Sequence, residues 1–269
     1  MGIVDPLQPY FVLSTNRYRK LIPTDSPIAH FYQFTYTEEN ASVNGVVPDG
    51  AIDLILDIQT GEAALFGSVV RAKESPLLRG HSYFGARFKP GSMEQFGDIP
   101  FHELTGSSAV LSDSSDWRAI EERLGDCGSF EQRAAVMKDS FADYAEKHHG
   151  EETPALLRNM LEMIYRSSGM VTVYELESAL FYSRRHLLRL FRQYIGMDIK
   201  SFCSIVRFQS VLPELNSGAR TGLAEMAQRF GYYDQTHFQK EFKKYSMLSP
   251  KNYRRLITNS GYYDRILFC

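Results

Sequence analysis

The sequence has few cysteines and no long apolar run. Its three cysteines, Cys127, Cys203 and Cys269, are far apart, so they predict neither a disulfide framework nor a paired-cysteine zinc site and are typical of a reduced cytoplasm. No apolar stretch reaches the roughly 20 residues that span a bilayer, and the N-terminus lacks a signal-peptide pattern. We therefore expect an unexported, cytoplasmic protein without membrane contact.

Patterns typical of catalytic sites are also missing. His30, His81 and His102 are isolated, without the close spacing that places two metal ligands on neighbouring strand positions. The sequence contains no phosphate-binding Gly-rich loop and no nucleophile elbow. We therefore expect a protein that is not an enzyme and that needs no cofactor or metal.

Charge is distributed unevenly, although the formal net charge is only -2. From Met170 onward there are 15 Lys+Arg against 8 Asp+Glu, which leaves 15 against 24 in residues 1–169 from the totals of 30 and 32. A basic C-terminal part joined to an acidic remainder is typical of a chain in which only one domain binds a polyanion. The length of 269 residues also favours two domains over one.

The basic part contains an internal repeat. Residues 182–194 read YSRRHLLRLFRQY and residues 233–245 read YDQTHFQKEFKKY, at a constant offset of 51. Ser183 and Asp234 are of the types that cap helix N-termini, and a further helical pattern precedes each copy. Two successive helix-turn-helix units are therefore predicted.

The second helix of each unit, about residues 184–194 and 235–245, has one apolar and one polar side. The apolar side predicts core packing, whereas long donors on the other side suit base edges in the major groove. For His186 and His237, packing or phosphate contact is favoured over metal binding. The residues predicted to bind DNA are Arg184, Arg185, Leu188, Arg189, Arg192, Gln235, Thr236, His237, Gln239, Lys240 and Lys243.

Residues 223–255 read LAEMAQRFGYYDQTHFQKEFKKYSMLSPKNYRR. With the first repeat copy, this stretch resembles the DNA-binding domain of the AraC family (AraC/XylS type) of bacterial transcription regulators. The resemblance covers residues of about 155–256 and implies two helix-turn-helix units joined by a linker helix, with double-stranded DNA as the partner. It also implies that six residues contact bases, namely Arg185, Leu188, Arg189, Thr236, His237 and Lys240.

A rigid linker helix beginning at Asp198 would set the two recognition helices about 34 Å apart, so that one monomer reads two successive major grooves. Four residues depart from the family pattern, namely Glu177, Phe181, Pro213 and Met247. The first three leave open an alternative function, a protein-interaction module with weak or vestigial DNA binding. The sequence does not separate activation from repression, and RNA polymerase is a further partner that the resemblance implies.

The N-terminal part has a different pattern. Alternating or apolar runs separated by turn signals predict a β-sandwich or small barrel. They occupy residues 30–36, 51–58, 63–70 and 82–88. Helical patterns follow at 116–124 and 129–148. The fragments VPDGAIDLI and YFGARFKPG resemble the cupin-like sensor domain of one AraC-family subgroup.

Asp53 and Arg87 are the notable charges in these strand-like runs. Paired and buried they would be structural, whereas an exposed Arg87 could contact an acidic small-molecule effector. An apolar stripe in the 129–148 helix either packs on its own β domain or forms a homodimer contact; it comprises Phe130, Ala134, Met137, Phe141, Tyr144 and His148. Protein effectors also remain open.

The expected fold class is α+β with two domains. Residues 1–150 would form a β-rich sensor or dimerisation domain, and residues 151–258 an all-α DNA-binding domain. Residues 259–269 would be a C-terminal tail.

Overall fold

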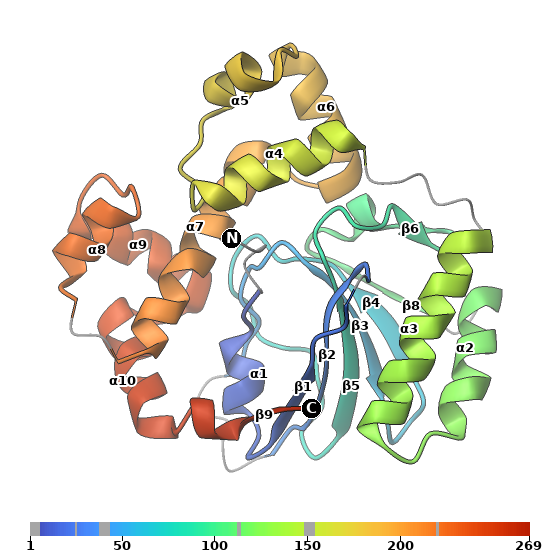
Figure 1. Cartoon of the computed structure of the whole chain (residues 1–269). Helices are drawn as coiled ribbons and strands as arrows, with labels where there is room; N and C mark the ends of the chain where they lie inside the picture. The colour runs from blue at the N-terminus through green and yellow to red at the C-terminus, as the bar shows by residue number, and fades with distance from the viewer. Residues whose placement is uncertain (1–5, 25, 38–43, 112–113, 148–153, 219–220) are drawn as a thin grey trace.

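The computed structural model describes residues 6–24, 26–37, 44–111, 114–147, 154–218 and 221–269, and it has a β-rich N-terminal part and a helical C-terminal part (Figure 1). The prediction of an α+β chain with this division is confirmed. The predicted domain boundary at residues 150 and 151 and His148 of the predicted stripe lie outside the described residues.

Seven strands form one sheet in the order β8-β4-β3-β5-β2-β1-β9. Neighbouring strands are antiparallel, except that β1 and β9 are parallel. The sheet strands are β1 (Tyr18–Leu21), β2 (Ile28–Thr35), β3 (Ile52–Asp57), β4 (Ala63–Phe66), β5 (Ser82–Phe88), β8 (Ser108–Val110) and β9 (Ile266–Phe268). A short ribbon of β6 (Gln95–Phe96) and β7 (Ile99–Pro100) lies apart from it. The four strand-like runs of the sequence correspond to β2, β3, β4 and β5.

The central strands are buried on both faces. One face packs against α2 (Ser115–Gly125) and α3 (Phe130–Lys147), seen on the right of Figure 1. The described residues of the predicted apolar stripe on α3 are buried in this core. The stripe therefore packs on its own β domain, and a homodimer would have to use another surface.

The other face of the sheet packs against α1 (Pro9–Leu13) and the last helices of the chain. Tyr32 and Gly85 are opposite each other on β2 and β5. A Cβ atom at Gly85 would come within 2.1 Å of the Tyr32 ring. Glycine is required there because the Tyr32 ring lies across the backbone of β5. In this position the Tyr32 hydroxyl donates to Asp53.

The helical part has two groups joined by the long helix α7 (Ile199–Asn216), as Figure 1 shows. The first group is α4 (Ala155–Arg166), α5 (Val173–Leu180) and α6 (Arg184–Ile195). The second is α8 (Leu223–Arg229), α9 (Gln235–Ser246) and α10 (Pro250–Ser260). Within the described part of the chain, no helix combines the length and hydropathy needed to cross a membrane.

The two parts share a hydrophobic core. Tyr10 and Phe11 of α1 are buried together with Phe208 of α7 and Phe242 of α9. Two short 3-10 helices are also present, η1 (Phe101–Leu104) and η2 (Tyr263–Arg265). The first helix group also contacts the β part, since a Cβ at Gly196 would lie 2.4 Å from the His102 carbonyl oxygen. Both helix groups are therefore packed on the β part.

The C-terminal segment joins the sheet. Strand β9 pairs with β1, and the Cys269 amide donates to the Lys20 carbonyl at 2.9 Å. The Arg265 guanidinium donates to the carbonyls of Leu13 and Thr15 at 3.2 and 2.6 Å. The segment expected as a tail therefore ties the last helix to the N-terminal sheet, which no sequence pattern indicated.

Candidate nucleic-acid interface

The helices α6 and α9 begin at capping residues. The Ser183 hydroxyl accepts from the His186 amide at 3.4 Å, and the Asp234 carboxylate accepts from the His237 amide at 2.7 Å. A capping box between Thr172 and Glu175 starts α5. The caps at Ser183 and Asp234 are where the sequence predicts them, so α6 and α9 begin at the expected residues.

The polar faces of α6 and α9 are open to solvent. Nine of the eleven residues predicted to bind DNA are exposed, and Leu188 and Gln239 are half-buried. The opposite faces are anchored by large apolar side chains that are fully buried, among them Leu187, Phe191, Phe238 and Phe242. Anchored helices with long exposed donors have the form needed to enter a major groove. Whether each of the eleven residues contacts DNA stays a prediction.

Three departures from the family pattern have a structural account. The Glu177 carboxylate accepts from the Arg184 amide at 2.6 Å, so it supplies a further cap for α6. Phe181 and Met247 both have left-handed backbone, with φ of 58° and 63°, at the ends of α5 and α9. Glycine is favoured at such helix ends. Phe181 is 91% exposed, so its ring contributes no packing to the fold.

The fourth departure, Pro213, lies near the end of α7, and proline in a helix interior removes a backbone hydrogen bond. The helix continues for three residues and ends at Asn216, and the Ser217 amide donates to the Pro213 carbonyl at 2.9 Å. Pro213 is exposed. Its ring therefore faces solvent in the last turn instead of breaking the linker.

Arg207 of α7 connects the two helix groups. Its guanidinium donates to the Gly169 carbonyl at 2.9 Å and to the Gly231 carbonyl at 3.4 Å, and it lies 5.5 Å from the centre of the Tyr232 ring. Gly169 precedes α5, and Gly231 has the positive φ that ends α8. One side chain thus bridges the segment before the first helix pair and the turn within the second pair, which restricts their relative orientation.

The histidines of the repeat have local structural roles. The rings of His186 and Tyr182 are stacked with centroids 5.3 Å apart. His237 Nδ1 accepts from the Tyr233 amide at 3.3 Å. In the described part of the chain no group of three or more metal-ligating side chains occurs.

Arg87 is fully buried, so it does not have the exposed position on which the hypothesis of an effector contact depended. Its guanidinium donates to both carboxylate oxygens of Asp53, at 2.9 and 2.7 Å, and lies 3.4 Å from Asp49. The buried Asp53–Arg87 pair is the structural alternative that the sequence left open. Tyr32 donates to the same Asp53 carboxylate at 3.0 Å.

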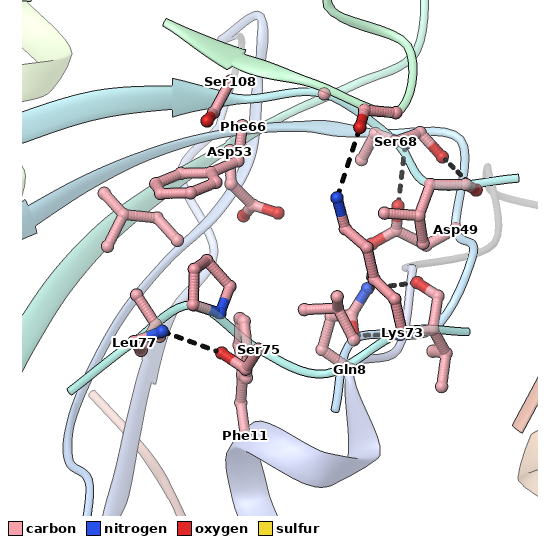
Figure 2. A pocket seen from close by; sticks show the side chains of 18 of the residues that line it. Gln8, Phe11, Asp49, Asp53, Phe66, Ser68, Lys73, Ser75, Leu77 and Ser108 are labelled. Atoms are coloured by element: carbon pink, nitrogen blue, oxygen red, sulfur yellow. Dashed lines mark hydrogen bonds between the residues drawn. The ribbon is translucent and has the colours of Figure 1, made fainter. Parts of the chain in front are cut away.

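The partners of Arg87 line a cavity of about 440 Å³ beside the sheet. Figure 2 shows Asp53 and Phe66 on one side of it, Gln8 and Lys73 on the other, and Phe11 below. In the sequence, Asp49 is part of the turn signal PDG at residues 48–50, and Gln8 and Lys73 belong to no distinctive pattern. Burial of Asp49 depends on contacts with Gln8 and Arg87, which are distant in sequence, so no local pattern could have indicated it.

The negative charge of the buried Asp49 carboxylate is only partly balanced by positive charge nearby. Burial raises its pKa to about 6, although the Arg87 charge opposes this effect. Arg87 gives both of its short hydrogen bonds to Asp53. Two carboxylates therefore share one guanidinium, and Asp49 is the one that binds a proton more readily in the folded chain than in the unfolded chain.

Replacing Asp49 by asparagine is expected to change how stability depends on pH. Because the folded-state pKa is raised, the folded chain holds a proton between about pH 4 and pH 6 that the unfolded chain releases, so this group's contribution falls as pH rises through that window. At neutral pH, Asp49→Asn should be more stable than the natural chain by on the order of 2 kcal/mol. Urea unfolding at about pH 4.5 and about pH 7 measures this, and a pH-independent difference would contradict it.

The geometry defines a protein with two helix-turn-helix units after a β-rich N-terminal part. Comparisons with known proteins agree with a helix-turn-helix domain in this position. Residues 176–256 match the family model described as "Helix-turn-helix domain", and residues 25–109 match "Domain of unknown function (DUF6597)". The first match makes residues 176–256 similar to helix-turn-helix domains of the AraC/XylS type. It agrees with the resemblance drawn from the repeat and the 223–255 stretch.

Individual relatives are similar over part of their length. The chain is 40% identical over 76 residues to an uncharacterized HTH-type transcriptional regulator of Haemophilus influenzae, which covers 28% of this chain and 25% of the relative. It is 30% identical over 86 residues to the HTH-type transcriptional activator AarP of Providencia stuartii. This match covers 32% of this chain and 62% of AarP. The chain thus spans less than two thirds of either relative.

Among solved structures, ToxT from Vibrio cholerae with a bound unsaturated fatty acid is similar over 90% of this chain and 95% of ToxT, with a TM-score of 0.44 and 13% identity.

Proposed function

We propose that this chain is a sequence-specific DNA-binding regulator of transcription in which α6 and α9 enter two successive major grooves. One observation carries the proposal: two helices related by an internal repeat present exposed Arg, Lys and Gln side chains while their opposite faces are fixed in aromatic and aliphatic cores. Exposed donors on anchored helices can read base edges. The excess of positive charge after Met170 provides the attraction to phosphate.

The exposed residues have two proposed roles. Base contacts are assigned to Arg185, Leu188 and Arg189 on α6 and to Thr236, His237 and Lys240 on α9. The remaining members of the set, Arg184, Arg192, Gln235, Gln239 and Lys243, are assigned mainly to phosphates. The Arg207 bridge and α7 support this arrangement because they fix one helix pair against the other.

The N-terminal part is proposed to be a cupin-like domain for sensing or association, with boundaries at about residues 1–150 and 151–258. Its cavity and its shared core with α7 and α9 support control of the DNA-binding helices by this part. Contact with RNA polymerase and homodimer formation are further proposals that follow from the family.

Selection of random duplex DNA by the full chain at near-physiological salt tests the proposal. We expect a motif with two half-sites about 10 base pairs apart. Arg189→Ala should weaken the base preference in one half-site, and Lys240→Ala should weaken it in the other. Each substitution should reduce the free energy of DNA binding by about 1–3 kcal/mol. Lys138→Ala, which removes an exposed charge on α3, is the matched control and should leave the motif unchanged.

The other outcomes are also informative. Binding that is sensitive to salt and shows no sequence preference would favour the interaction module with vestigial DNA binding. A motif that is lost in one half only with Lys240→Ala, and never with Arg189→Ala, would mean that α9 alone reads sequence.

A further inference from the structure

The cavity beside the sheet has the size and lining of a ligand site. Its volume of about 440 Å³ lies within the range of small-molecule pockets. Strands β3 and β4 contribute Asp53, Ile55 and Phe66 to its lining, and the other lining residues come from the start of the chain around α1 and from segments 46–51, 67–77 and 106–108. The side chains of Phe11, Ile55 and Phe66 give it an apolar surface.

Two aspartate residues that are more than nine-tenths buried lie on this cavity. Asp49 and Asp53 are 5% and 8% exposed, and Figure 2 shows the Asp53 carboxylate directed into the open space. Each Asp49 oxygen accepts one described hydrogen bond, from the Ala51 amide at 3.0 Å and from the Gln8 side chain at 2.9 Å. A carboxylate oxygen can accept more than one, so acceptor capacity remains.

The charges around these carboxylates do not balance. Arg87 is the cation of both described ion pairs and carries one positive charge against two negative charges. Lys73 also lines the cavity, but it is exposed and its ammonium donates to the Gly106 carbonyl at 3.2 Å. A buried charge without full compensation is costly, and the raised pKa of Asp49 has this cause. A cation in the cavity would supply the missing charge.

We propose that this cavity binds a small organic amine, with its ammonium against the carboxylates of Asp49 and Asp53 and its apolar body against Phe11, Ile55 and Phe66. Charge-assisted hydrogen bonds from an ammonium to a buried carboxylate are among the strong polar contacts in proteins. A carboxylate ligand would meet two like charges, and an alcohol would leave the imbalance in place.

The same contacts reach the helix that joins the two helix groups. The Gln8 side chain holds both the Asp49 carboxylate and the Val47 backbone. On either side of that bridge, the Gln209 side chain of α7 binds the Leu7 and Pro48 backbones. Asp49 is therefore connected to α7 through Gln209, which binds the backbone of Pro48 next to Asp49 and of Leu7 next to Gln8. In this respect the inference rests on the proposed function, because the consequence at DNA requires that function.

Calorimetric titration of the full chain with matched compounds tests the proposal. The probes are butylamine, cyclohexylamine and 2-phenylethylamine, each compared with its alcohol, and 3-phenylpropionate. At least one amine should bind about tenfold more tightly than its alcohol, and 3-phenylpropionate should not bind. Asp49→Asn should remove the preference for amine over alcohol. Glu74→Gln, at an exposed residue that also lines the cavity, should retain it.

Ser108 is an exposed residue of β8 that lines the cavity, so Ser108→Trp should narrow the cavity. The binding of every amine should become weaker, while the contacts of Asp49 stay unchanged. Equal binding of amine and alcohol, preference for the carboxylate, or no binding by any amine would overturn the proposal. Selection of DNA with and without the bound amine is a separate readout. A DNA motif without amine binding would overturn this inference alone, whereas amine binding without a motif would overturn the proposed function alone.

Discussion

Replacing Arg87 by methionine is expected to lower the free energy of unfolding by about 3–5 kcal/mol, because it leaves two buried carboxylates without their shared cation. The Arg87 side chain is fully buried and also donates to the Pro6 carbonyl at 3.2 Å. Small proteins have total stabilities of about 5–15 kcal/mol. The variant should therefore be partly unfolded at moderate temperature, which circular dichroism and urea unfolding would measure.

The loss should become smaller on acidification, since protonation of Asp49 removes one of the two like charges. Arg166→Met is the matched control, because Arg166 forms an exposed pair with Glu162 at 2.8 Å on α4. Such pairs contribute about 0–1 kcal/mol. Similar losses for both variants would show that burial does not govern the Arg87 cluster.

The helices of the proposed interface could be predicted from sequence because their determinants are local. Ser183 and Asp234 lie next to the helices that they cap, and the apolar spacing in residues 184–194 and 235–245 marks the buried faces directly. The strands β2, β3 and β5 were also predicted, since each is a run of apolar or alternating residues between turns. The internal repeat also indicated that the chain contains two helix-turn-helix units and not one.

The features that were missed depend on contacts between distant residues. Strands β1 and β9 have only four and three residues, and β9 is stabilised by pairing with a strand at the other end of the chain. Asp49 looked like a turn residue because the residues that bury it are remote in sequence. Periodicity describes which face of an element is apolar and does not identify its long-range partner.

Gln209 is the clearest case of a residue whose role depends on distant partners. It lies in the middle of α7 and is 3% exposed. Its side chain accepts from the Leu7 amide at 2.9 Å and donates to the carbonyls of Leu7 and Pro48 at 3.1 and 2.7 Å. These partners are 202 and 161 residues away in the sequence. In a linker helix, the sequence alone shows only a neutral polar residue.

Gln209→Leu is expected to destabilise the chain by at least about 2 kcal/mol. Leucine is similar in size but removes the partner of the buried Pro48 carbonyl and of the partly buried Leu7 backbone groups, and a buried group without a partner costs about 1–3 kcal/mol. Urea unfolding measures the loss. Amide hydrogen exchange should also become faster around residues 44–50, because α7 no longer holds the segment that carries Asp49.

Gln193→Leu provides the matched control, since Gln193 also connects the helical and β parts but does so through an exposed hydrogen bond to Glu94 at 3.2 Å. A surface substitution of this kind should change stability by no more than about 0.5 kcal/mol. If Gln209→Leu were equally mild and left exchange at residues 44–50 unchanged, the apolar core around Phe208 and Phe242 would be sufficient to hold the two parts together. The cavity would then have no polar connection to α7 that matters, and any response of DNA binding to an amine would have to pass through that core.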